Sequence, residues 1–119
     1  MQEKTISPRD SSIIEHIRSY CEDIERAVLR FGDSYEQFEA DKDYRNSCVL
    51  CILQIGELCN HLSEEFRLEH TELPWRAIIG MRNIAAHHYG SMSMERVWGT
   101  VKLDIPTLHD FCNSILNQK

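Results

Sequence analysis

Residues 41–67 read DKDYRNSCVLCILQIGELCNHLSEEFR, and this segment contains the strongest periodic pattern of the chain. Apolar residues recur at intervals of three or four, which is the repeat of an α-helix with one buried face. The pattern predicts one long central helix over residues 41–67, and its buried face carries Tyr44, Cys48, Ile52, Ile55, Cys59, Leu62 and Phe66.

A second long helix is predicted before it, over residues 10–31. It ends at Gly32, a residue suited to closing a helix. Between the two helices, Ser34 is a candidate cap for a short helix that carries Tyr35 and Phe38 and closes one end of the bundle. The buried face of the second long helix has the same rhythm as the central one: Ile13, Ile17, Cys21, Ile24, Val28 and Phe31.

Two more helices are predicted in the second half of the chain. Pro74 suits the first turn of a helix that breaks at Gly90-Ser91, and a last helix covers residues 93–117. Pro106 lies near the middle of this last helix, where the missing N–H and the ring predict a kink or a restart near Asp104. Because no segment alternates like a strand, the fold class is all-α, an antiparallel bundle of four to five helices in a single domain over residues 1–119.

Composition limits the class of protein further. The five cysteines are an odd number and lie in apolar helix faces, which indicates buried thiols rather than a disulfide framework. Cys48-x2-Cys51 is half of a possible zinc site, but no second pair completes it, so neither a metal nor a cofactor is predicted. The chain has no apolar run near the roughly 20 residues of a membrane span, and its polar N-terminus lacks the apolar core of a signal peptide. We therefore expect a cytoplasmic protein.

The formal net charge of −6 argues against a protein that coats nucleic acid with its whole surface. The charge is unevenly distributed, because residues 74–102 hold four basic residues against Glu95 alone, a local +3 that leaves −9 elsewhere. A phosphate ligand would be attracted to this part of the chain, although an ordinary solvated face can show so small an excess.

Residues 82–89, RNIAAHHY, carry the side chains best suited to phosphate chemistry. The arginine fork matches phosphate oxygens, and a histidine exchanges protons near neutral pH. On an ideal helix, Asn83 and His87 are about 40° apart, whereas Arg82 and His87 are about 140° apart. Three arrangements would join them: an Arg82 side chain that sweeps round the helix, an unwinding near Ala86, or the same motif of a second subunit. We favour the last, because a two-fold axis would gather both pairs into one cleft.

The motif resembles the signature of the HEPN superfamily in its HepT-like branch, Arg-x4-His-x-Tyr with an asparagine after the arginine. The similarity covers nearly the whole chain. It includes Gln54-Ile55-Gly56-Glu57, Leu73-Pro74-Trp75-Arg76, Gly80-Met81-Arg82-Asn83, Val97-Trp98, Val101-Lys102 and Asp104-Ile105-Pro106.

The resemblance implies a homodimeric ribonuclease toxin of a HepT/Mnt-type toxin–antitoxin pair. The motif residues fit that activity, because no carboxylate cluster adjoins them in the sequence and RNA carries its own nucleophile, the 2′-hydroxyl. In this interpretation Arg82 and His87 are catalytic: Arg82 holds the phosphate, and His87 acts as base or acid. Asn83 orients His87. The resemblance also implies that Tyr89 is AMPylated by a Mnt-type nucleotidyltransferase antitoxin.

Structural interpretations compete with these roles. Taken singly, Arg82 suits a surface salt bridge and His87 a bundle histidine, while His88 is an exposed neighbour and His61 pairs with Glu57 on the surface. The acidic stretch is a solvated face or a contact for a basic antitoxin surface: Glu64, Glu65, Glu69 and Glu72. The alternative function is a non-catalytic helical interaction module that binds nucleotide or serves as the substrate of the nucleotidyltransferase.

Overall fold

The computed structural model describes residues 6–87 and 89–117. These residues form no strand, so the predicted all-α class is confirmed. Four helices have twelve residues or more, and shorter ones connect them. In chain order the elements are α1 Pro8–Phe31, α2 Tyr35–Ala40, α3 Lys42–His61, α4 Glu64–Glu69, α5 Trp75–His87, the 3-10 helix η1 Tyr89–Ser91, α6 Met94–Gly99, the π-helix η2 Thr100–Asp104 and α7 Ile105–Leu116.

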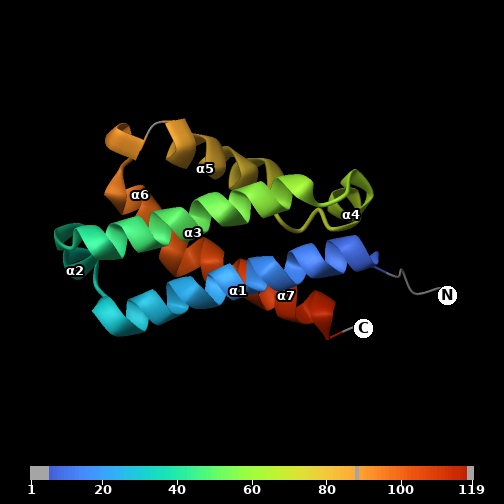
Figure 1. The fold of residues 1–119 in the computed structure, drawn as a ribbon, viewed down its shortest axis with the longest axis horizontal. Helices are drawn as coiled ribbons and strands as arrows, with labels where there is room; N and C mark the ends of the chain where they lie inside the picture. The colour runs from blue at the N-terminus through green and yellow to red at the C-terminus, as the bar shows by residue number, and fades with distance from the viewer. Residues whose placement is uncertain (1–5, 88, 118–119) are drawn as a thin grey trace.

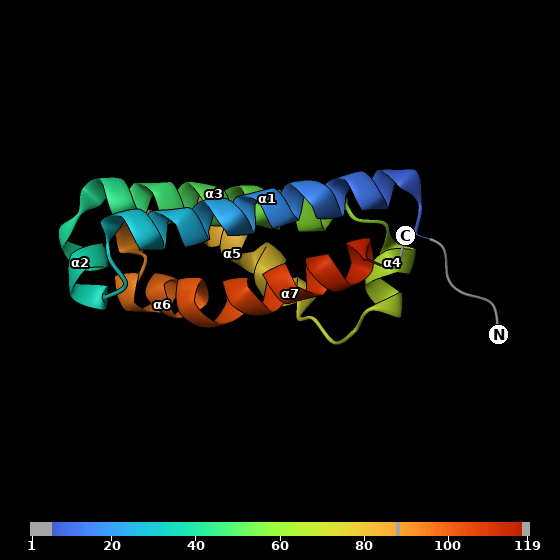
Figure 2. The same cartoon turned by 90° about the horizontal axis from the view of Figure 1, so that it is seen from below.

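The long helices form an antiparallel bundle with α3 at its centre. Figure 1 shows α3 between α1 and α5, and both neighbours pack against it. The view from below shows α1 and α3 side by side in one layer, with α6 and α7 across from them (Figure 2). Among the described helices, none combines the length and the apolar character that a bilayer crossing requires. The arrangement leaves α5 packed mainly on one neighbour, and this helix carries the motif.

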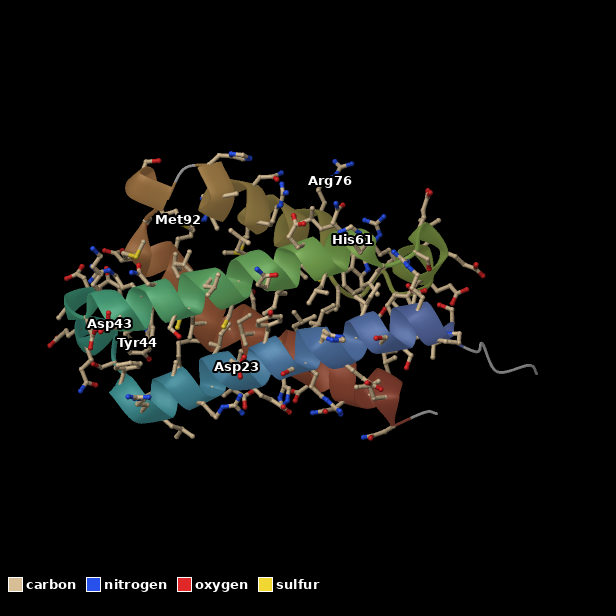
Figure 3. The ribbon with its side chains drawn as sticks, viewed as in Figure 1. Asp23, Asp43, Tyr44, His61, Arg76 and Met92 are labelled. Atoms are coloured by element: carbon tan, nitrogen blue, oxygen red, sulfur yellow. The ribbon has the colours of Figure 1, made fainter. Side chains whose placement is uncertain are left out.

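An aromatic cluster closes the end of the bundle at α2. The rings of Phe38 and Tyr44 have centroids 5.0 Å apart, and those of Phe38 and Trp98 are 5.2 Å apart. The Tyr44 hydroxyl donates to the carbonyl of Gly32 at 3.0 Å (Figure 3 labels Tyr44). Gly32 has φ of 117°, a conformation that glycine adopts without strain, and it ends α1. The predicted stop at Gly32 and the predicted short helix capped by Ser34 are confirmed.

The prediction of one helix over residues 41–67 is wrong, because α3 ends at His61 and α4 begins at Glu64. The break depends on Asp10, which is only 3% exposed at the start of α1. Its carboxylate accepts hydrogen bonds from the Ser63 backbone N–H at 2.9 Å and the Ser63 hydroxyl at 2.6 Å. That N–H is therefore used outside the helix, and the Ser63 hydroxyl caps α4 instead. Leu62 and Phe66 remain buried, so the bend keeps the apolar rhythm of the segment.

The last predicted helix restarts where Pro106 requires it. The α-helix α6 passes into the π-helix η2, in which the Ile105 N–H donates to the carbonyl of Thr100, five residues earlier. Pro106 then lies in the first turn of α7, where its missing N–H leaves no helix bond unmade. A π-helical turn before a proline accommodates the proline ring while the chain stays helical.

Helices α3 and α5 are in close contact at Gly56. A Cβ built on Gly56 would lie inside the contact distance of the Arg82 Cβ and 3.3 Å from the Arg82 Cα and N. Only a residue without a side chain allows the backbones to come this close. A Cβ built on Gly80, which also lies in α5, would have no atom of another element within 4 Å. Gly56 therefore fixes the distance between the central helix and the motif.

We predict that Asp10→Ala lowers the free energy of unfolding at pH 7 by about 1–3 kcal/mol, because the partly buried Ser63 donors lose their acceptor. Urea titration measures the change.

The loss should depend on pH. Burial by itself raises the pKa of Asp10, but hydrogen bonds from Ser63 and Ser7 and the charge of Arg9 outweigh it and lower the pKa below its usual range. A lowered folded-state pKa stabilises the protein above the unfolded-chain value of about 3.9, and this contribution disappears as pH falls through the folded value. The gap between wild type and variant should narrow below about pH 4. A gap that stays constant down to pH 2 would contradict this account.

We predict that Gly56→Ala destabilises the protein by about 1–3 kcal/mol, because the added methyl group forces α3 and α5 apart. The matched control is Gly80→Ala, which should be neutral or stabilising by up to about 1 kcal/mol, since alanine is the better helix former and has room there. Thermal unfolding of both variants measures the contrast, and equal losses would exclude a tight contact at Gly56.

Candidate functional site

Residues 82–87 of the motif occupy the C-terminal half of α5, and Tyr89 begins η1. Ala85 is buried against the core, while Asn83, Ile84 and His87 are exposed. The α-helix is regular through His87, and the 3-10 helix η1 follows from Tyr89. The imidazole of His87 is thus presented to solvent at the C-terminus of α5.

Arg82 is held by two neighbouring side chains. Its Nε–H donates to the carboxylate of Glu57 on α3, and its Nη1 donates to Oδ1 of Asn83 at 2.7 Å. The Arg82 and Glu57 side chains are 35% and 32% exposed, so the pair lies at the boundary between core and solvent. The guanidinium is oriented by contacts on two of its edges, and the two bonds use two of its five N–H donors.

The structure excludes two of the three arrangements that would join Arg82 to His87. The unwinding near Ala86 does not occur, because α5 stays helical there. The Arg82 side chain does not sweep round to His87 either, since it bonds to Glu57 and Asn83. Among the described residues no hydrogen bond connects Arg82 with His87, and Asn83 binds the arginine rather than the histidine. A single chain therefore places both groups on α5 without bringing them together.

Glu57 is the site residue that the sequence interpretation missed. It was paired with His61, one turn later, but its carboxylate bonds to Arg82, and His61 is exposed. The available signal was its position beside Gly56, because a glycine inside an otherwise apolar helix face often marks a close helix contact. A carboxylate thus does adjoin the motif, although it comes from another helix.

For two residues of the motif, the structure describes the side chain of neither. His88 lies outside the described residues, and so does the side chain of Tyr89. The backbone of Tyr89 begins η1, directly after the motif helix.

The positive charge near the motif is partly neutralised. Lys102 pairs with Asp33 at 2.6 Å, and Arg82 pairs with Glu57. Arg76 and Arg96 are exposed and form no ion pair with the described residues. Figure 3 shows Arg76 at the outer edge of α5. These two arginines and His87 are the groups most available to an anionic ligand.

The cysteines and the acidic residues show no sign of a metal or catalytic site among the described residues. All five cysteines are buried and free, as predicted. Burial raises the pKa of the Cys48 thiol to about 12 and that of the Cys51 thiol to about 11. Within residues 6–87 and 89–117, no three His, Cys, Asp or Glu side chains are grouped to hold a metal ion. The acidic stretch is exposed along its length: Glu64, Glu65, Glu69 and Glu72.

A groove of about 760 Å³ separates α5 from α6, η2 and α7. Its floor is apolar and includes Ile55, Ile78 and Met81, and Arg96 lies among the residues that line it. Ile84, next to Asn83, also lines the groove and is 38% exposed. The motif therefore borders an apolar depression as well as open solvent.

Comparison with known proteins gives one consistent family. A protein of Caldanaerobacter subterraneus subsp. tengcongensis named "Putative RNase" is 33% identical over 106 residues, which cover 89% of this chain and 93% of that protein. A "Probable ribonuclease HepT" of Thermococcus cleftensis is 31% identical over 96 residues, covering 76% of this chain and 87% of the relative. A "Putative RNase" of Methanocaldococcus jannaschii is 30% identical over 74 residues, covering 62% and 68%.

No solved structure gives a significant match. The HepT-like ribonuclease family matches residues 13–115, which run from the second turn of α1 to the last turn of α7. The chain therefore belongs to the HepT-like ribonuclease family.

Proposed function

We propose that this protein is an endoribonuclease, the toxin subunit of a type VII-like toxin–antitoxin pair that acts in the cytoplasm. The observation that carries the proposal is the exposed motif on α5 of a chain in the HepT-like ribonuclease family. Arg82, oriented by Glu57 and Asn83, is the phosphate-binding cation, and His87 is the proton-transfer group. The family and the names of the relatives support cleavage of RNA as the reaction.

The proposed reaction needs only groups that RNA and the motif supply. The 2′-hydroxyl oxygen attacks the adjacent phosphorus while a base removes its proton, and the bond from phosphorus to the 5′-oxygen breaks. A proton passes to the leaving 5′-oxygen, so the products are a 2′,3′-cyclic phosphate and a 5′-hydroxyl. Proton transfer by a positioned histidine contributes about 10²–10⁴-fold. A guanidinium stabilises the charge that develops on the phosphate oxygens.

The proposed active form is a homodimer. Arg82 and His87 of one chain point to different sides of α5, so a second motif would supply the missing partner for each. The exposed Ile84 within the motif and the groove that it lines support a contact here. Unfilled apolar surface of this kind is typical of interaction sites.

We predict that the protein cleaves an RNA oligonucleotide and leaves its all-DNA analogue intact, because DNA lacks the internal nucleophile.

His87→Ala should reduce the cleavage rate by about 10²-fold or more and leave the fold unchanged, since the side chain is exposed. The matched control is His61→Ala, an exposed histidine on α3 that should cleave at the wild-type rate. Gel assays and circular dichroism give the readouts.

Equal cleavage of DNA and RNA would contradict the proposed reaction. An unchanged rate for His87→Ala would exclude His87 as the proton-transfer group. Absence of RNA cleavage by the wild-type protein would favour the alternative function, a helical module that binds nucleotide or serves only as the nucleotidyltransferase substrate.

We further propose that a Mnt-type nucleotidyltransferase antitoxin neutralises the toxin by AMPylating Tyr89. The position of Tyr89 supports this, because its backbone directly follows the motif helix. An added phosphodiester would place negative charge next to the arginines and compete with the RNA phosphate.

We predict that incubation with ATP and the cognate antitoxin adds an AMP group to Tyr89 and abolishes cleavage. Intact-mass and peptide mass spectrometry locate the modification. Tyr89→Phe should remain an active nuclease that the antitoxin no longer silences by modification, and Tyr20→Phe is the matched control. Full neutralisation with an unmodified Tyr89 would contradict the proposal.

A further inference from the structure

We propose that Glu57 is a positioning residue of the RNA site, which holds the guanidinium of Arg82 in the orientation that the cleaved phosphate requires. The inference rests on the proposed function and adds a residue from outside the motif. It starts from the contact between α3 and α5, which joins two residues 25 positions apart in the chain.

The first argument is that this ion pair is built into the helix packing. Glu57 follows Gly56, the residue that allows α3 to approach the Arg82 backbone. Both side chains are about two-thirds covered, whereas an ordinary surface pair joins two long, mobile side chains in water. Helix packing thus holds Glu57 and Arg82 close together, so that forming the ion pair costs little additional side-chain entropy.

The second argument concerns which part of the guanidinium is used. Glu57 accepts from Nε, and Asn83 accepts from Nη1. These two bonds prevent rotation of the planar group and leave three N–H donors for a ligand. An arginine held in this way can meet a phosphate with a defined pair of donors, which is the geometry that makes arginine selective for phosphate.

The third argument concerns charge. Glu57 cancels the net charge of Arg82, so it cannot strengthen the general attraction of RNA to the site. Its contribution must come from orientation, which acts on the transition state more than on the bound ground state. Removing Glu57 should therefore slow the chemical step without weakening RNA binding, and this combination distinguishes positioning from simple attraction.

The test compares steady-state cleavage of one RNA oligonucleotide by wild type, Glu57→Ala, Glu57→Gln and Asp110→Ala. Glu57→Ala should lower kcat by about 10- to 100-fold with an unchanged or lower KM. Glu57→Gln keeps an acceptor for the Nε–H and should remain within about 3-fold of wild type. Asp110→Ala removes an exposed carboxylate on α7 and makes the same charge change, and it should cleave like wild type.

Unchanged or higher kcat in Glu57→Ala would overturn the inference, and a higher value would mean that Glu57 competes with the phosphate for Arg82. Equal losses in Glu57→Gln and Glu57→Ala would also overturn it. The thermal unfolding midpoint of each variant, compared with that of wild type, identifies a variant that loses activity because it is unfolded.

A second measurement does not require cleavage. The Nε–H signal of Arg82 in a nitrogen–proton NMR spectrum should be sharp and protected from exchange in wild type, and lost in Glu57→Ala. A wild-type protein that fails to cut RNA refutes the proposed function, whereas an Arg82 signal that is unaffected by Glu57→Ala refutes the role of Glu57.

Discussion

The close contact of α3 with α5 is the constraint on which the site depends. Gly56 brings the two backbones together, and the Arg82–Glu57 pair forms at the place where they meet. The motif helix has few other neighbours, because a groove separates it from α6, η2 and α7. The position of the guanidinium is thus set by the central helix rather than by the motif itself. A short motif acquires a fixed geometry only when another element holds it.

The charge distribution of the chain follows the same logic. An acidic protein repels RNA over most of its surface, and the basic residues between Pro74 and Lys102 give a local exception. Two of these basic residues are neutralised by Glu57 and Asp33, which leaves Arg76, Arg96 and His87 exposed and without an ion pair to the described residues. In the proposed site, attraction of the RNA and orientation of its phosphate are therefore assigned to different residues. Long-range attraction needs free charges, whereas orientation needs fixed ones.

Much of the fold could be predicted because its helices have clear apolar faces and ordinary end signals. Gly32, Ser34 and Pro106 act through their own backbone chemistry, so their effects were visible in the sequence. The break after His61 was not visible, because it depends on a buried carboxylate 53 residues earlier, at Asp10. Glu57 was missed for a similar reason: a neighbour one turn away suggested a local pair, and the actual partner lies on another helix. Angular spacing correctly separated Arg82 from His87, since it depends only on helix geometry.

The burial of all five thiols has a consequence for the chemistry of the protein in the cell. Only the thiolate form reacts readily with oxidants and electrophiles. Cys51, whose pKa burial raises to about 11, is ionised in roughly one molecule in ten thousand at pH 7. The thiols of the native protein are therefore poor targets for peroxide and for glutathione exchange, and they become more reactive when the bundle opens. Thiol oxidation would accordingly act on unfolded copies before folded ones.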